Sequence, residues 1–231
     1  MLTDYHCHIL PGIDDGSENT EMSVKMLGLQ RQQGVERIIA TPHFYAHREK
    51  SVDNFLKKRD NSYKKLIGSE VDLTNVFLGA EISIEKGISE LDGIEKLAVE
   101  GTDLILLEFP YTGFKDWMPE EVHNIACEHK LVPMIAHLHR YVSIFSKEEM
   151  EAVLRMKAIF QINNEAFAGF REKKFAAKLI KNGVRYVFGS DCHNITVRSP
   201  NFDILKKEFR KKPEIIEASD NIYEKHVLKK V

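Results

Sequence analysis

Short strand-like runs alternate with helical patterns along nearly the whole chain of 231 residues, and this alternation limits the fold more than any other feature. Seven such runs can be read from the sequence: Leu2–His8, Arg37–Thr41, Asn75–Ile82, Asp103–Phe109, Val132–His137, Ala158–Ile162 and Tyr186–Ser190. Strands that alternate with helices predict a parallel sheet with helices packed outside it. We therefore expect a single α/β domain over residues 1–231, and seven strands with intervening helices can close into a barrel.

The helical patterns carry the signals that mark helix ends. The run Thr20–Gln33 stops at Gly34, and a glycine just after the last turn is typical of a helix C-terminus. Pro119, followed by two acidic residues, predicts the start of a second helix. Ser146 and Glu149 have the spacing of a capping box, which predicts a third.

Nearly every predicted strand is apolar until its carboxyl end, where a histidine, aspartate or glutamate follows. The residues concerned are His6, His8, His43, Glu81, Glu108, His137, Asp191 and His193. His6 and His8 are two residues apart, so they share one face of a strand while Cys7 points away. Two aspartates, Asp14 and Asp15, follow shortly after the first strand. The carboxyl ends of barrel strands meet at one face, where α/β barrels carry their active sites.

A metal centre explains this pattern better than separate structural roles do. One histidine or glutamate at a strand end is more often a buried polar residue or an ion-pair partner. Six strands with the same feature would bring imidazoles and carboxylates together, and without a cation their burial costs several kcal/mol. Imidazole and carboxylate ligands without thiolate favour manganese, iron or zinc. The candidates outnumber the ligands of one tetrahedral ion, so two or three ions are predicted.

Composition and charge argue against other classes of protein. The formal net charge of −2 at pH 7 provides no positive field to attract nucleic acid. No apolar run reaches membrane-spanning length, so no membrane insertion is expected. The first residues lack the pattern of a secretory signal. Three widely spaced cysteines fit a cytoplasmic protein with reduced thiols. The sequence leaves the oligomeric state open.

Six motifs occur in a fixed order: HCHILPGIDDG, TPH, GAEI, LEFP, IAH with RY shortly after it, and SDCHN. As a set they resemble the PHP (polymerase and histidinol phosphatase) superfamily, and more closely the bacterial manganese-dependent protein tyrosine phosphatases of capsule and exopolysaccharide loci. The resemblance runs from Leu2 to about Arg198. It implies a distorted, TIM-like, seven-stranded (βα)7 barrel with the metal site at the carboxyl ends of the strands.

The resemblance also implies a role for individual residues. The implied ligands are His6, His8, Glu81 and Asp191 for the first metal, Glu81, Glu108 and His137 for the second, and Asp14, His43 and His193 for the third. Asp14, rather than Asp15, matches the family's ligand. Arg140 and Arg198 match the arginines that grip the phosphate, so they are the expected catalytic residues beside the metals.

The activity implied is that of a phosphoric monoester hydrolase, a protein-tyrosine-phosphatase that uses a metal-activated hydroxide. The expected cofactor is manganese, with iron or zinc as alternatives, in two or three copies. The expected partner is a phosphotyrosine protein, in particular the tail of a bacterial tyrosine autokinase that regulates capsular polysaccharide synthesis. Two other functions stay open: another PHP phosphoesterase such as a histidinol phosphatase, and a non-catalytic metal-binding regulatory protein. The last predicts a broken ligand set, and the sequence shows no break.

One stretch departs from the family pattern. The family usually has HPERY after the fifth strand, where this chain has His137-Leu138-His139-Arg140-Tyr141. The metal ligand and the arginine are retained, so the metal site is expected to stand. We interpret His139 as a change in the support around the site, and a phosphate contact or a proton donor is the alternative.

Overall fold

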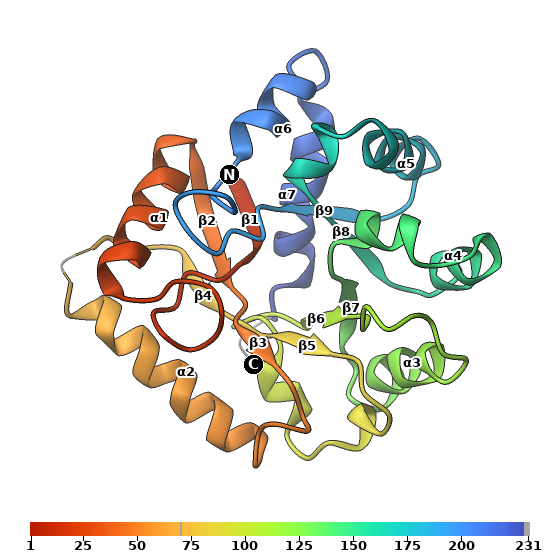
Figure 1. Ribbon diagram of the computed structural model, residues 1–231, viewed down its shortest axis with the longest axis horizontal. Coiled ribbons are helices and arrows are strands. Elements are labelled where there is room, and N and C mark those ends of the chain that lie inside the picture. The colour runs from red at the N-terminus through yellow and green to blue at the C-terminus, as the bar shows by residue number, and fades with distance from the viewer. Residues whose placement is uncertain (70, 229–231) are drawn as a thin grey trace.

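The computed structural model describes residues 1–69 and 71–228; the domain predicted over residues 1–231 also includes positions outside these ranges. The chain forms an α/β fold in which parallel strands lie at the middle and helices surround them (Figure 1). The strands are β1 Leu2–Cys7, β2 Val35–Ala40, β3 His43–Phe44, β4 Val76–Leu78, β5 Glu81–Ser83, β6 Leu104–Glu108, β7 Val132–Ile135, β8 Ile159–Asn163 and β9 Tyr186–Gly189. The α-helices are α1 Thr20–Gln32, α2 Val52–Ile67, α3 Met118–Glu128, α4 Lys147–Leu154, α5 Phe170–Lys181, α6 Phe202–Glu208 and α7 Glu214–His226. Short 3-10 helices are η1 Ile88–Glu90, η2 Ile94–Leu97, η3 Leu138–Ser143 and η4 Asn164–Phe167.

The predicted helix ends are confirmed. Helix α1 ends one residue before Gln33, and Gly34 follows with φ +77°, a left-handed conformation that glycine adopts without strain. Pro119 lies in the first turn of α3. In α4 the Ser146 side chain accepts from the backbone of Glu149, whose carboxylate accepts from the backbone of Ser146.

The predicted closed sheet is not found in the described residues, because the strands form two parallel sheets. One has the order β1-β2-β4 and the other β3-β5-β6-β7-β8-β9. Pro42 separates β2 from β3, and proline has no N–H to donate to a neighbouring strand. The partner strand breaks at the same level, so the predicted strand Asn75–Ile82 is two segments, β4 and β5, joined at Gly79 and Ala80.

Strands β1 and β9, which belong to different sheets, lie side by side at their carboxyl ends. The backbone N–H of Asp191 donates to His6 O at 2.7 Å, and that of His8 donates to Cys192 O at 2.9 Å. Gly189 makes this approach possible, since a Cβ there would lie 2.8 Å from the Cβ of His6. The contact brings the two ends of the strand order together (Figure 1).

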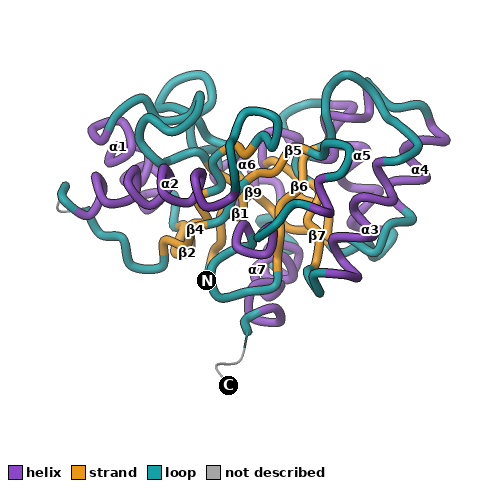
Figure 2. The backbone as a smooth tube through the Cα atoms, turned by 90° about the horizontal axis from the view of Figure 1, so that it is seen from below, coloured by secondary structure: helices purple, strands orange, loops and turns teal. Residues whose placement is uncertain are grey.

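Two hydrophobic clusters hold the strands in place. One contains alternate residues of the strands, such as Tyr5, Ile39, Leu104 and Val187, together with residues of α7. The other fills the space between the strands and the surrounding helices. Figure 2 shows α7 at the end of the strand assembly where the chain begins. No helix in the described residues combines the length and apolarity needed to cross a membrane.

Candidate metal centre

His6 and His8 point from the end of β1 toward the same point. The Nδ1 atom of His6 lies 3.1 Å from Gln161 Oε1, and that of His8 lies 2.8 Å from Asp14 Oδ2. Because these oxygens accept hydrogen bonds, each Nδ1 carries the proton and leaves Nε2 as the atom able to bind a metal. The two Nε2 atoms are 3.1 Å apart, and both rings are fully buried.

Glu81, at the start of β5, lies at the centre of the candidate ligands. Its Oε2 atom is 3.1 Å from His6 Nε2, 3.2 Å from His8 Nε2 and 3.1 Å from His43 Nδ1. Its Oε1 atom is 3.0 Å from His137 Nε2. One carboxylate therefore faces four imidazoles from three different segments of the chain, which is the arrangement expected of a ligand that bridges metal ions.

Glu108 and His137 complete one side of the centre, and Asp191 the other. Glu108 Oε1 lies 3.3 Å from His137 Nε2, and Asp191 Oδ1 lies 3.5 Å from Nε2 of both His6 and His8. His137 and Asp191 have φ values of 30° and 50°, in the left-handed region that such residues rarely adopt. Backbone strain of this kind clusters at functional sites, where the surrounding structure fixes it.

The third part of the centre, called the third corner below, contains His43, His193 and one of the two adjacent aspartates. Asp15 Oδ1 lies 3.3 Å from His43 Nε2 and 3.5 Å from His193 Nε2. Asp14, the ligand predicted from the family resemblance, lies beside this corner rather than between the two rings. Asp14 accepts hydrogen bonds from the backbone of Gly16 and His43 as well as from His8, so both its oxygens are engaged beside the corner.

A glycine makes this turn possible. A Cβ on Gly16 would collide with the Cβ and the carbonyl oxygen of His8, so no other residue fits without displacing a candidate ligand. The backbone N–H of Gly16 donates to Asp14 Oδ1 at 2.9 Å, which turns that carboxylate toward His8 and leaves Asp15 to face His43. The motif IDDG thus places both aspartates next to candidate ligands, Asp14 beside His8 and Asp15 beside His43.

Three groups of possible ligands result, each with its donor atoms within 4.8 Å of one another. They are His8, Asp15, His43 and His193; His6, His8 and Glu81; and His43, Glu81 and Glu108. Among the described residues, the buried atoms Glu81 Oε2, His43 Nδ1 and His193 Nε2 have no hydrogen-bond partner. Buried polar atoms are normally paired, so lone pairs that converge without a donor fit shared metal ions.

The charges of the centre also favour a cation. Burial lowers the pKa of His8, but the carboxylate of Asp14 beside it raises that pKa well above its usual value. Burial raises the pKa of Glu81, but the attraction of His6 and the contacts with His137 and His8 together outweigh it, so that the pKa falls well below the usual range. The Glu81 carboxylate is therefore ionised, and a metal ion bound there would replace the protons that the imidazoles otherwise hold.

Several residues support the centre in roles that the sequence did not assign, although Asn163 stands at the end of a predicted strand. Gln161, on β8, accepts hydrogen bonds from the ring of His6 and from the backbone of His137, and Asn163 donates to Asp191 at 3.0 Å. The ring of Tyr111 stacks on that of His137. A glutamine and an asparagine two residues apart at the end of an apolar strand are the only signal the sequence contains for the first two.

The two predicted arginines lie beside the centre and contact the same carboxylate. Arg140 Nη1 is 2.8 Å from Asp191 Oδ2, and Arg198 Nη2 is 2.9 Å from both oxygens of Asp191. Their side chains are 25% and 34% exposed, so both can also be reached from solvent. His139 is buried, with its Nε2 atom 3.7 Å from Glu165, and so lies toward the arginine rather than among the ligands.

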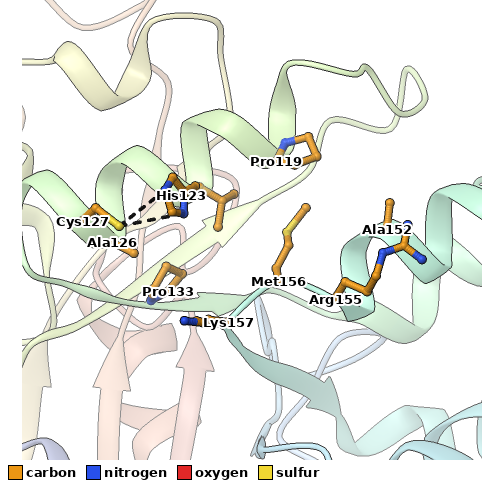
Figure 3. A pocket seen from close by; sticks show the side chains of 10 residues that line it. Pro119, His123, Ala126, Cys127, Pro133, Ala152, Arg155, Met156 and Lys157 are labelled. Carbon is orange, nitrogen blue, oxygen red and sulfur yellow. Dashed lines mark hydrogen bonds between the residues drawn. The ribbon is translucent and has the colours of Figure 1, made fainter.

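A separate hollow of about 410 Å³ lies between α3 and α4 and the strands next to them (Figure 3). Its lining is largely apolar, with Pro119 and Met156 on opposite sides. The exposed thiol of Cys127 lies 3.6 Å from Nε2 of His123, one turn away on α3. None of the predicted ligands lines this hollow. Cys7 and Cys192 are buried in the core, and all three thiols are free.

A parallel α/β fold with clustered imidazoles and carboxylates at the carboxyl ends of its strands defines a class of α/β proteins with a candidate metal site at that end of the sheet. Within that class, this chain belongs to the CpsB/CapC family of capsular polysaccharide synthesis, whose model matches residues 2–225. The family resemblance seen in the sequence is thereby confirmed.

Two curated relatives extend over most of the chain. The tyrosine-protein phosphatase YwqE of Bacillus subtilis is 30% identical over 221 residues, which is 90% of this chain and 85% of that protein. The tyrosine-protein phosphatase CpsB of Streptococcus pneumoniae is 29% identical over 234 residues, 90% of this chain and 91% of that protein.

Solved structures show the same fold. The crystal structures of YwqE from Bacillus subtilis and CpsB from Streptococcus pneumoniae, described as metal-dependent tyrosine phosphatases, match with a TM-score of 0.76 and 26% identity, over 98% of this chain and 94% of that chain. A histidinol phosphate phosphatase from Lactococcus lactis matches with a TM-score of 0.60 and 15% identity, over 94% of this chain and 93% of that chain. The second likeness concerns the fold alone.

Proposed function

We propose that this protein is a metal-dependent protein-tyrosine-phosphatase, a phosphoric monoester hydrolase that acts on phosphotyrosine in proteins. The observation that carries the proposal is the convergence of strand-end imidazoles and carboxylates around Glu81. Its relatives at 29–30% identity are named tyrosine-protein phosphatases and match over about nine-tenths of the chain. The proposal includes the distorted barrel, which the contact between β1 and β9 supports.

The proposed cofactor is manganese, in two or three ions. The proposed ligands are those predicted from the sequence, namely His6, His8, Asp14, His43, Glu81, Glu108, His137, Asp191 and His193, with Asp15 added at the third corner. Contacts support Asp15 as the direct ligand there, with Asp14 holding the ring of His8 in place. Imidazole and carboxylate donors without thiolate suit manganese, iron and zinc.

Bound metal ions would supply a water of lowered pKa as the nucleophile and positive charge for the phosphate oxygens. The chain's own residues would do the rest. Arg140 and Arg198 would each donate from a planar, permanently charged fork to phosphate oxygens, which carry most charge in the transition state. The leaving group is a phenolate with a pKa of about 10, so a strong general acid is less necessary than for an alkoxide.

The physiological partner we propose is the phosphorylated, tyrosine-rich tail of a bacterial tyrosine autokinase in capsular or exopolysaccharide synthesis, met in the cytoplasm. The family description, capsular polysaccharide synthesis, supports this setting. A non-catalytic regulatory role would fit a broken ligand set, whereas every predicted ligand lies at or beside the centre. A histidinol phosphatase shares the fold only, so we do not propose that activity.

The test combines elemental analysis with activity assays on the purified protein. We expect manganese-loaded protein to hydrolyse a phosphotyrosine peptide in preference to a phosphoserine peptide and to histidinol phosphate. Treatment with EDTA should abolish this activity, and Mn²⁺ should restore it. Full activity after exhaustive removal of metal, or a preference for histidinol phosphate, would overturn the proposal.

A further inference from the structure

Arg140 is held at two points, and only one of them belongs to the metal centre. Its Nη1 atom contacts Asp191 at 2.8 Å. Its other edge faces Glu165, whose Oε1 atom accepts from Nη2 at 2.6 Å and from Nε at 3.2 Å. Glu165 therefore fixes the guanidinium plane along its Nε and Nη2 edge, and Nη1, which has two hydrogens and contacts Asp191, faces the centre.

Glu165 is in turn held by its own neighbours. It lies in η4, directly after β8, and its Oε1 atom accepts from Asn163 Nδ2 at 3.3 Å. His139 Nε2 lies 3.7 Å away. His139 and Arg140 lower the pKa of Glu165 to about 2, so the carboxylate is ionised at neutral pH. Glu165 thus lies just after β8, the strand whose side chains support the centre.

We propose that Glu165 is a positioning residue, which fixes the guanidinium of Arg140 so that its Nη1 side faces the phosphate of the substrate. The inference rests on the proposed function, in which Arg140 binds phosphate. A free arginine loses rotamer freedom when it is held in one geometry. Glu165 imposes that restriction before the substrate arrives, which is the effect of preorganisation.

The opposite role for Glu165 makes a different prediction. An anion already bound to Arg140 would compete with phosphate for the same donors, and its removal would then tighten phosphate binding. The contacts favour positioning, because Glu165 occupies Nε and Nη2 while Nη1 faces the centre through Asp191. Phosphate approaching from the centre would meet Nη1, which Glu165 does not contact.

The experiment is a double-mutant cycle of Glu165→Ala and Arg140→Ala, measured on metal-loaded protein. Three quantities are followed: kcat/KM for a phosphotyrosine peptide, the equilibrium binding of inorganic phosphate by calorimetry, and metal content. We expect Glu165→Ala to lower kcat/KM and to weaken phosphate binding about 10-fold each, with metal content unchanged. In the Arg140→Ala background, the same substitution should change neither quantity.

Two further variants distinguish a specific role of Glu165 from a general effect of removing a side chain or a charge. Glu165→Gln retains an acceptor for Arg140 but loses the charge, so it folds readily and should show an intermediate loss. Glu172→Ala removes a carboxylate that lines the same hollow as Glu165 but lies beside Gly169, and it should behave as wild type. It controls for the loss of one negative charge near Arg140.

Three results would overturn the proposal. Wild-type kinetics and phosphate binding in both Glu165 variants would remove it from the site. Equal losses with and without Arg140 would mean that Glu165 acts independently of the arginine. Tighter phosphate binding would make Glu165 a competitor. Failure of the proposed function would look different, because wild-type protein would not hydrolyse the peptide while the binding of phosphate still reported on Glu165.

Discussion

The two ends of the strand assembly both bury polar side chains, and they satisfy them in opposite ways. At the end covered by α7, the hydroxyl of Tyr5 donates to Ser219 O at 3.0 Å and accepts from Tyr223 N at 2.7 Å. Asp220 accepts from Thr3 N at 2.8 Å. None of these atoms is among the buried polar atoms without a partner in the described part of the chain.

At the carboxyl ends of the strands, by contrast, Glu81, His43 and His193 each bury an atom that has no partner among the described residues. The difference distinguishes residues that stabilise the fold from residues that are suited to bind a ligand. Paired buried groups stabilise the fold, and an unpaired set that converges is suited to receive something else. Substitutions at the α7 end should therefore change stability and leave kinetics intact, and substitutions at the metal centre should do the reverse.

The largest effect is expected at the carboxylate in the middle of the centre. Glu81→Gln keeps the size of the side chain but removes the charge that faces four imidazoles. We expect activity at background level and reduced metal content, with an unchanged far-UV circular dichroism spectrum. Elemental analysis, kinetics and the spectrum test this together. An active, metal-loaded variant would show that Glu81 is not a ligand and would weaken the comparison.

The next effect concerns the rim of the centre and separates phosphate binding from metal binding. Arg198→Ala should lower kcat on the order of 10²-fold, because a charged donor to the transition state is lost. Arg198→Lys should recover only part of this, since lysine lacks the planar fork. Metal content should stay at the wild-type level in both. Loss of metal would mean that Arg198 acts through its contact with Asp191, and wild-type kinetics would place it outside the site.

The sequence predicted the convergence of ligands because that feature is local. A strand alternates with a period of two, so His6 and His8 must share a face, and apolar runs mark where each strand ends. The separate contacts of Asp14 and Asp15 were less accessible, because hydrogen bonds from the backbone of Gly16 and His43 hold the Asp14 carboxylate in place. Spacing alone does not contain those contacts.

Long-range pairing was also beyond the reach of local patterns. Gln161 supports His6 from 155 positions along the chain, and only the fold brings them together. The break of the third predicted strand into β4 and β5 also depends on a segment that is distant in the sequence. The break is caused by Pro42, which interrupts the hydrogen bonds of the neighbouring strand. The segment that breaks has the sequence pattern of a single strand.

The α7 end should respond in stability rather than activity. Tyr5→Phe removes the hydroxyl that hydrogen-bonds to Ser219 O and Tyr223 N, two backbone groups one turn apart in α7. The expected cost is about 1 kcal/mol in the free energy of unfolding. Urea unfolding measures it, and kcat/KM for an aryl phosphate should match wild type. A loss of kcat at full metal content would show that the two ends are coupled.

The smallest effect is a change in pH dependence at the same end. Burial raises the pKa of Asp220 to about 6, above the value of about 3.9 in an unfolded chain. The native state therefore holds the proton more tightly, and the contribution of this group to stability is greatest below about pH 4 and falls as the pH rises through 6. Asp220→Asn removes the titration while its side-chain oxygen can still accept from Thr3 N. The variant should thus gain stability relative to wild type on going from pH 5 to pH 7.5, as measured by urea unfolding at both values.

Glu217→Gln serves as the control, because Glu217 lies on the exposed face of α7 and its substitution removes one charge without changing the contacts of Asp220. A difference between Asp220→Asn and wild type that stays constant with pH, or one that shrinks as the pH rises, would show that Asp220 is not held in its protonated form by burial.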